Sequence, residues 1–259
     1  MKRHRVAALI GGLALLCGVP ALAQTSAPAP DLSFAQAQQA AKSGDALAQY
    51  RLGVMYDSGD GVPADPHKAF DWFQRAAMQG LAEAQYNVAV MYDEGQGVQQ
   101  SYVLAANWYN AAAEQGVVEA QYNLGMMYSQ GQGQPQDDAT AAYWLYKAAN
   151  QNYAPAQYNI GLAYLNGAGV SPDPLTACHW FLTAARQGDG DAQMEVAKCY
   201  ENGRGGSRDA VKAYAWALVA AQAGQEGAAA YLDRLGAGVN DSQKTVAISM
   251  ASGLVNPAS

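Results

Sequence analysis

Cysteine, histidine and basic residues are scarce in this sequence of 259 residues. It has three cysteines, three histidines and 15 lysines and arginines, against 22 aspartates and glutamates, which gives a formal net charge of −7. Metal sites need several cysteine, histidine or carboxylate ligands together, and His67 and His179 stand apart from any such group. A negative balance also disfavours nucleic acid and anionic lipid as partners. The composition therefore predicts neither a metal site nor a nucleic-acid interface.

Catalytic motifs are missing as well. The sequence contains no G-x-S-x-G, S-x-x-K, H-E-x-x-H or phosphate-loop pattern. Its many Gly-x-Gly pairs follow helical patterns rather than strands, which argues against a dinucleotide site. We therefore expect no catalytic residues, no cofactor and no enzymatic activity.

Only one long hydrophobic run is present, near the start of the sequence. Val6–Val19 is apolar, follows basic residues at positions 2, 3 and 5, and precedes Ala21-Leu22-Ala23. This pattern is typical of a bacterial signal peptide, and the run is too short for a membrane span. We expect cleavage near Ala23, a flexible linker at residues 24–30, and a periplasmic or secreted mature protein. Cleavage removes three of the 15 basic residues, so the mature chain has 12 basic and 22 acidic residues and a formal net charge of about −10. This charge favours a basic partner, and solubility alone would also explain it.

What the sequence does contain is a pattern that recurs five times with a spacing of 36 residues. An internal period of this length is typical of solenoid proteins. Every tryptophan of the chain stands in one column: Trp72, Trp108, Trp144, Trp180 and Trp216. Tyrosines and glutamines form further columns: Tyr56, Tyr92, Tyr128, Tyr164 and Tyr200, and Gln49, Gln85, Gln121, Gln157 and Gln193.

Each unit has the pattern of a helix, a turn and a second helix. In the first unit, Leu52, Met55 and Tyr56 recur on one helical face, and a Gly-x-Gly turn follows. A second helix then surrounds Trp72. A single hairpin cannot bury its own apolar face, so consecutive hairpins must stack. We expect the tryptophans to be buried in this core, with Trp216 contributing less because it lies nearer an end.

The repeat resembles the Sel1-like repeat family, a relative of the tetratricopeptide repeats. The resemblance rests on the motifs A-Q-Y-x-L-G-x-x-Y, G-x-G-V and A-x-x-W-[FY]-x-x-A-A-x-x-G, between Gly44 and about Ala223. The second and third units match best, whereas the fifth has Met194 for the aromatic residue and Gly206 for the valine after the turn. The resemblance implies an all-α, right-handed α-solenoid of five antiparallel helical hairpins, and adaptor work between proteins.

The repeats and their flanks also define the domain organisation. We expect an N-terminal capping helix at residues 31–43 and C-terminal capping helices with a tail at residues 224–259. Between them, we expect the five repeats at residues 44–79, 80–115, 116–151, 152–187 and 188–223. The first helix aligns with the second helix of a repeat and should therefore cover the first hairpin. Asp31 or Ser33 is the expected cap of that helix, and Asn240 or Asp241 that of the last one.

Two cysteines remain after the signal peptide. Cys178 lies 10 residues before Gly188 and Cys199 lies 11 residues after it, and Gly188 marks the turn between two antiparallel helices. Equal distances from such a turn place two residues opposite one another, and an exported protein meets oxidising conditions. A disulfide and two separate buried thiols are both compatible with this pattern.

By analogy with related repeats, the first helices should line the concave side of the solenoid. The columns of residues 47, 50, 54 and 57 should point there, because their spacing keeps them on one helical stripe. We expect this face to bind an extended or helical segment of another protein, while packing against the next hairpin is the alternative role for its tyrosines. The candidate contact residues are Tyr50, Tyr86, Tyr122, Tyr158, Asn87, Asn123, Asn159, Glu83, Glu119 and Asp93.

The leading interpretation is an exported, monomeric, non-catalytic scaffold of the bacterial envelope that binds a protein or peptide. One alternative is a protein that binds peptidoglycan or another cell-wall glycan, since tyrosine and tryptophan stack on sugars. A second is an enzyme of the β-lactamase type, because some cysteine-rich relatives are linked to penicillin binding. The missing nucleophile and base motifs weigh against the enzyme.

Overall fold

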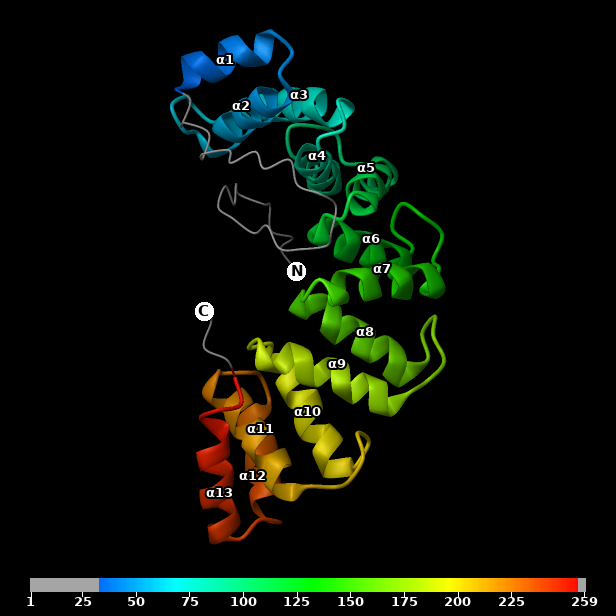
Figure 1. Cartoon of the computed structure of the whole chain (residues 1–259), viewed down its shortest axis with the longest axis vertical. Helices are drawn as coiled ribbons and strands as arrows, with labels where there is room; N and C mark the ends of the chain where they lie inside the picture. The colour runs from blue at the N-terminus through cyan, green and yellow to red at the C-terminus, as the bar shows by residue number, and fades with distance from the viewer. Residues whose placement is uncertain (1–32, 256–259) are drawn as a thin grey trace, which may run out of the picture. The chain divides into compact units, whose positions relative to one another are not determined.

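The computed structural model describes residues 33–255, and this part of the chain contains thirteen α-helices and no strand (Figure 1). The all-α prediction is therefore confirmed. The helices are α1 (Phe34–Lys42), α2 (Ala46–Ser58), α3 (Pro66–Met78), α4 (Ala82–Glu94), α5 (Tyr102–Glu114), α6 (Val118–Gln130), α7 (Asp138–Asn150), α8 (Ala154–Asn166), α9 (Pro174–Arg186), α10 (Gly190–Asn202), α11 (Ala210–Gln222), α12 (Ala228–Gly236) and α13 (Asp241–Ala251). The expected signal peptide, the linker and Asp31 lie outside the described residues. No helix among residues 33–255 is long and apolar enough to cross a membrane.

The chain divides into two compact units, with the boundary between Ala120 and Gln121. In unit 1, α1 packs against α2, and the hairpins α2–α3 and α4–α5 stack through α3 and α4. In unit 2, α7 packs against α8, the hairpins α8–α9 and α10–α11 stack through α9 and α10, and α12 and α13 both contact α11. Consecutive hairpins therefore form an α-solenoid within each unit, as the repeat predicts.

Local hydrogen bonds define where each hairpin turns. The first helix ends at a glycine in the left-handed conformation, as at Gly59 (φ 79°) and Gly167 (φ 73°). The second helix begins at an aspartate or serine whose side chain accepts a backbone N–H, as Asp65 does from Lys68 at 3.1 Å. The backbone N–H of Asp65 also donates to the carbonyl of Tyr56 at 2.8 Å. These bonds satisfy groups that a helix end otherwise leaves unpaired, so turn and caps act together.

The second glycine of two Gly-x-Gly turns, Gly97 and Gly169, has a different role. A Cβ atom at Gly97 would overlap the carbonyl oxygen of Pro66, and one at Gly169 would overlap that of Asp138. These turns therefore lie directly on the first residues of the preceding second helix, and only glycine allows that approach. In the fifth repeat a positive φ falls on Gly206 (126°), where the sequence departs from the motif.

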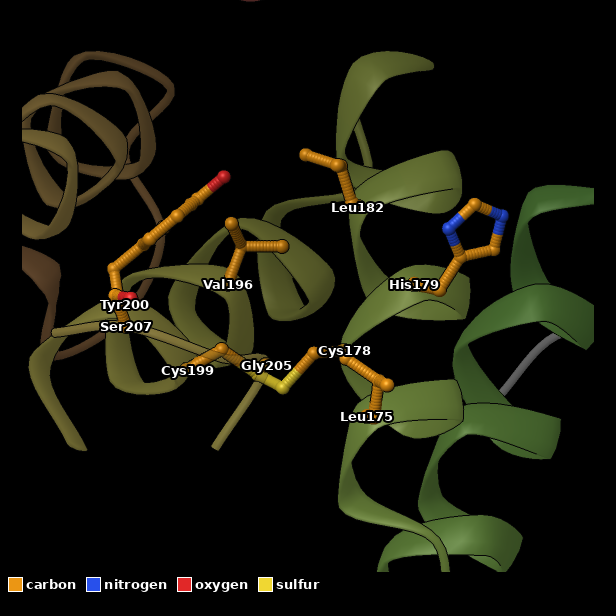
Figure 2. A pocket seen from close by; sticks show the side chains of 9 residues that line it. All are labelled: Leu175, Cys178, His179, Leu182, Val196, Cys199, Tyr200, Gly205 and Ser207. Carbon is orange, nitrogen blue, oxygen red and sulfur yellow. A yellow bond between two sulfur atoms is a disulfide. The ribbon is translucent and has the colours of Figure 1, made fainter. Parts of the chain in front are cut away.

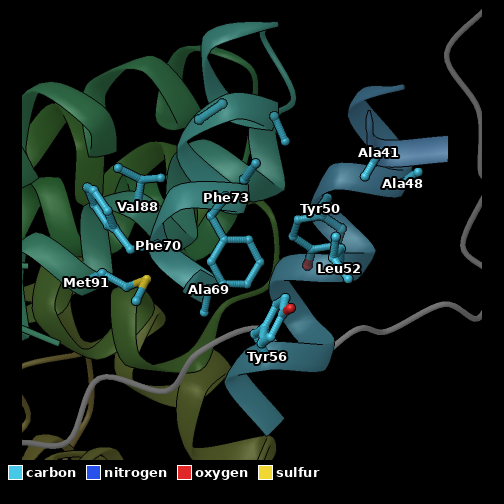
Figure 3. Close-up of a cluster of buried hydrophobic side chains, with 13 residues drawn as sticks. Ala41, Ala48, Tyr50, Leu52, Tyr56, Ala69, Phe70, Phe73, Val88 and Met91 are labelled. Carbon is cyan, nitrogen blue, oxygen red and sulfur yellow. The ribbon is translucent and has the colours of Figure 1, made fainter. Parts of the chain in front are cut away.

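Close approach of paired helices forms the core of each hairpin. A Cβ atom at Gly53 or Gly161 would lie 2.6 Å from the ring of Phe73 or Phe181, respectively. Phe73 and Phe181 are almost fully buried, at 2% and 0% exposure. In the cluster of α2 and α3, the rings of Tyr50 and Phe73 lie against each other at an interplanar angle of 46°, with centroids 5.6 Å apart (Figure 3). A glycine on one helix therefore makes room for an aromatic ring on the next.

The tryptophan column is buried to different degrees. Trp216 is 2% exposed and Trp144 is 7% exposed, whereas Trp72, Trp108 and Trp180 are only partly buried. The expectation that Trp216 contributes less than the others does not agree with this burial. The reason is that α12 and α13 both pack against α11 and cover the end of the repeat array.

Each repeat contains a buried glutamine, and at Gln49, Gln85 and Gln157 this side chain connects the end of one helix to the end of a later one. The glutamines of this column are all buried: Gln49, Gln85, Gln121, Gln157 and Gln193. Gln157 Nε2 donates to the carbonyl of Ala149 at 3.2 Å, and Gln157 Oε1 accepts from Nε2 of Gln187 at 2.7 Å. Ala149 lies at the end of α7 and Gln187 caps α9, so one side chain joins the ends of two successive second helices. The same pair of bonds recurs at Gln49 and Gln85.

The fifth repeat lacks half of this arrangement. Gln193 Nε2 donates to the carbonyl of Ala185 at 3.3 Å, but Gln193 Oε1 is buried without a hydrogen-bond partner. The position 30 residues later, which supplies the donor in other repeats, is Ala223. A buried acceptor without a donor costs about 1–3 kcal/mol. The series of glutamine bonds is therefore weakest at its last member.

Cys178 and Cys199 form a disulfide between α9 and α10. Their Cα atoms are 6.0 Å apart, and 21 residues separate them in the sequence. Of the two alternatives that the sequence leaves open, the structure has the bond rather than two separate thiols. A cross-link over a loop of this length contributes roughly 2–4 kcal/mol by restricting the unfolded chain. It joins the fourth repeat to the fifth, where the glutamine series ends.

The burial difference within the tryptophan column predicts different effects of the same substitution. Trp216→Ala should lower the free energy of unfolding by about 3–5 kcal/mol, because it empties a fully buried site. Trp180→Ala, at a partly exposed position of the same column, should lower it by roughly half as much. Urea denaturation followed by far-UV circular dichroism measures both values. An equal or larger loss for Trp180→Ala would contradict the burial difference.

The unpaired Gln193 oxygen predicts a stabilising substitution. Ala223→Gln places a donor at the position that Gln187 occupies one repeat earlier, and should raise the free energy of unfolding by about 0.5–1.5 kcal/mol. Ala223→Met is the matched control, since methionine is unbranched and similar in length but carries no N–H. The interpretation fails if both variants unfold at the same urea concentration.

Candidate binding face

The first-helix face is the surface formed by the columns of residues 47, 50, 54 and 57, and much of it is buried in unit 1. Tyr50 is 7% exposed and Tyr86 is 1% exposed. Their rings lie against Phe73 and Tyr109, with centroids 5.6 and 5.8 Å apart. Burial raises the pKa of the Tyr50 phenol above its ordinary value. These two rings therefore pack inside their own hairpins, whereas the alternative considered from the sequence was packing against the next hairpin.

Three polar residues that we expected to contact a partner are also buried. Asn87, Asn123 and Asp93 are 4%, 3% and 6% exposed. The Asn87 side chain hydrogen-bonds that of Tyr50, and Asp93 Oδ2 accepts from the hydroxyl of Tyr109 at 3.3 Å. A partner could not reach these groups without opening the core. The sequence could not show this, because asparagine and aspartate are usually found at the surface.

The other candidate residues keep accessible surface: Glu83, Glu119, Tyr122, Tyr158 and Asn159. In unit 2, Tyr122 lies edge-on to Tyr153 with ring centroids 5.4 Å apart. Asn159 Nδ2 donates to the carbonyl of Pro155 at 2.8 Å, so part of its hydrogen-bonding capacity is used within α8. Tyr158 packs against Phe181 with centroids 5.8 Å apart. The accessible candidates in unit 2 therefore lie on α6 and α8.

Three carboxylates of α10 and its N-cap act electrostatically on the phenol of Tyr158. Partial burial raises the pKa of Tyr158 to about 12, and the negative charges of Asp191, Glu195 and Asp189 add to the effect. Burial also raises the pKa of Asp189, with Asp191 contributing. Lys198 Nζ contacts Glu195 at 2.6 Å and is the cation paired with this group. Three carboxylates against one lysine leave the face negative around an accessible tyrosine.

A second tyrosine, Tyr231 of α12, also lies next to a carboxylate, that of Glu201 on α10. The hydroxyl of Tyr231 donates to Glu201 Oε2 at 2.7 Å, and Arg234 donates to both oxygens of Glu201, at 2.7 and 2.9 Å. Burial raises the pKa of Tyr231, and the bond to Glu201 adds to this. The bond from Arg234 holds the pKa of Glu201 below its usual range. Sequence reasoning missed Tyr231, although it stands 36 residues after Glu195 and so continues the column of Asn87, Asn123 and Asn159, which neighbours the face.

The surface around Tyr158 is suited to binding a cation through its carboxylates and an apolar group through the tyrosine ring. Leu162, on the same stripe as Tyr158, is partly exposed and adds apolar surface. Within residues 33–255, no cluster of histidine, cysteine, aspartate and glutamate is arranged to hold a metal ion. His67 uses Nδ1 in a hydrogen bond of 3.0 Å with the carbonyl of Gly97.

A small cavity of about 140 Å³ lies beside the disulfide in unit 2. Cys178 and Cys199 form one wall, and Leu182, Val196 and the exposed His179 contribute to its lining (Figure 2). The lining contains no carboxylate, and its two hydroxyl-bearing residues, Tyr200 and Ser207, lie on the opposite side of the disulfide from His179 (Figure 2). The cavity therefore presents no acid–base or nucleophilic arrangement.

Comparison with known proteins places this fold in a family. The Sel1 repeat matches residues 46–81, 82–117, 118–153, 154–189 and 190–225. The crystal structure of c5321, a protective antigen of uropathogenic Escherichia coli with an SLR fold, covers 85% of this chain at 34% identity and a TM-score of 0.78. A Sel1 repeat protein from Oxalobacter formigenes covers 78% at 38% identity and a TM-score of 0.68. This chain spans 48% and 59% of the lengths of those two proteins. None of the curated proteins matches the sequence.

The matched repeats have the 36-residue period of the sequence and begin two residues after the bounds expected from the sequence. Together they cover residues 46–225, which include every tryptophan and every buried glutamine of the repeat columns. The chain belongs to the Sel1 repeat family.

Proposed function

We propose that this protein is a non-catalytic scaffold that holds a basic segment of another protein on the first-helix face of unit 2. Sel1 repeats generally mediate contacts between proteins. The observation that carries the proposal is the group of three carboxylates at α10 whose charges act on the partly exposed Tyr158. Tyrosine offers a large contact surface at a low entropic cost, and the carboxylates select a positively charged partner.

The positions of these carboxylates indicate that the partner binds at α8 and α10. Asp191 and Glu195 lie on α10 and act on Tyr158 of α8, so the negative region extends over two successive first helices. Asp191 also accepts from Gln225 Nε2 at 2.7 Å, which fixes its orientation. A lysine or arginine side chain of a partner can approach these oxygens while its aliphatic part contacts Tyr158 and Leu162. Buried Tyr50 and Tyr86 in unit 1 offer no comparable surface.

The test removes charge without changing shape. The double variant Asp191→Asn, Glu195→Gln should bind a fluorescently labelled peptide of alternating lysine and leucine several-fold more weakly than the wild type, because two partly screened charge contacts are lost. The double variant Asp71→Asn, Glu94→Gln changes two exposed acids of unit 1 and is the matched control. Fluorescence anisotropy at two salt concentrations measures the affinities.

Equal binding by both double variants would exclude this face as the site. Affinity capture from envelope extract with the same variants then asks whether a natural partner depends on the same carboxylates. Tyr86→Ala is unsuitable for either experiment, because it empties a buried site in unit 1.

We also propose that the protein works in the bacterial cell envelope after removal of residues 1–23. The support is the basic start, the apolar run and the Ala21-Leu22-Ala23 sequence, together with a disulfide that suits an oxidising compartment. Mass spectrometry of the protein from its native host should show a mature chain that begins near Gln24. An intact N-terminus in the cytoplasmic fraction would contradict export.

A further inference from the structure

A cavity of about 340 Å³ lies where the repeat array ends, between the end of α10, the start of α11 and the turn after α12. Its walls include the apolar residues Ala213, Leu235 and Val239, of which none is more than 9% exposed. Arg208 and Arg234 also line it. This volume is at the lower end of the range, about 300–1,000 Å³, in which proteins hold small ligands.

The repeat geometry explains why the cavity exists. In earlier repeats the turn that contains Gly97 lies on Pro66, and the turn that contains Gly169 lies on Asp138. Ala210 occupies the same column at the start of α11, but the residue that would cover it, Asp241, belongs to α13. The Gly-x-Gly sequence that follows the fifth repeat, Gly236-Ala237-Gly238, comes three residues before the expected column, and neither of its glycines has the positive φ of a regular turn. The space that such a turn fills elsewhere therefore stays open beside Ala210.

The charges at this cavity favour an anion. Glu201 accepts one N–H from each of Nη1 and Nη2 of Arg234, and the side chain of Tyr231 takes part in a further hydrogen bond, which leaves two N–H groups of that guanidinium for other acceptors. Arg234 also lies over the ring of Tyr231, 4.8 Å from its centroid, so its position is fixed from two sides. Arg208 makes no ion pair within residues 33–255, and its charge acts on Glu201. Two guanidinium groups against one carboxylate leave one positive charge beside an apolar wall.

We propose that this cavity binds a carboxylate carried on a small branched apolar group. Arg208 and the free N–H groups of Arg234 would hold the carboxylate oxygens, because guanidinium groups pair with carboxylates through directed, charge-assisted bonds. Ala213, Leu235 and Val239 would contact the apolar group. The same chemistry occurs in a free short-chain acid and in the C-terminal leucine or valine of a polypeptide. The site is separate from the proposed function, since it uses α11 and α12 rather than Tyr158.

The experiment uses the full mature chain and defined probes. N-acetyl-leucine, 4-methylpentanoate and the peptide acetyl-Ala-Ala-Leu are titrated into ¹⁵N-labelled protein, and N-acetyl-leucinamide serves as the uncharged control. Saturable shifts of the amide signals of Ala210 and Gly238 should appear with the acids and not with the amide. Arg208→Gln should weaken binding roughly tenfold or more, as expected for loss of a charge-assisted bond. Arg204→Gln, an exposed arginine of the same turn that does not line the cavity, should bind as the wild type does.

The three acids distinguish the two sources of the carboxylate. Tighter binding of the peptide than of 4-methylpentanoate assigns the site to a polypeptide C-terminus, and the reverse order assigns it to a free acid. Equal binding of N-acetyl-leucine and its amide by the wild type would overturn the proposal without any variant. Shifts confined to residues away from the cavity, or no saturable shift with any acid, would overturn it as well.

Discussion

The buried glutamine of each repeat is the interaction on which the stack of hairpins depends. Helices of two neighbouring hairpins end in the same apolar interior, and their last carbonyl groups need donors there. Gln85 supplies one to Ala77 and accepts from Gln115, so the end of α3 is joined to the end of α5 by a single side chain. An apolar residue at that position would fill the space but leave the carbonyl with one bond fewer. The register between successive repeats is therefore set by hydrogen bonds as well as by packing.

The same constraint explains where the molecule differs from a regular array. At the fifth repeat the series ends at Gln193, the Gly-x-Gly turn changes at Gly206, and a disulfide joins α9 to α10. The helices α12 and α13 cover the last hairpin, but no further turn covers Ala210. The end of the repeat array therefore has both a missing hydrogen bond, at Gln193, and an open space, beside Ala210. In this chain the open space carries two arginines in an otherwise acidic protein.

Periodicity alone predicted the parts of the fold that repeat. The 36-residue spacing located the helical hairpins, and the Gly-x-Gly pairs predicted where the first helices end. For the terminal helices the sequence left two caps open at each, Asp31 or Ser33 and Asn240 or Asp241, and the structure has Ser33 and Asn240. What it could not predict is burial within a column, because that depends on neighbours outside the repeat. Tyr86 and Tyr158 share a column, yet the first is 1% exposed and the second is partly accessible. Trp216 is buried by helices that follow the last repeat, which no count of repeats reveals.

A double-mutant cycle at Gln157 and Gln187 tests the central claim most directly. Gln157→Met and Gln187→Met each remove one partner of the 2.7 Å bond between their side chains. If glutamine bonds join successive hairpins, the double variant should be less destabilised than the sum of the single variants, with a coupling energy of about 1 kcal/mol in urea unfolding. Strictly additive losses would show that the two side chains do not stabilise each other, and that packing alone holds the hairpins in register.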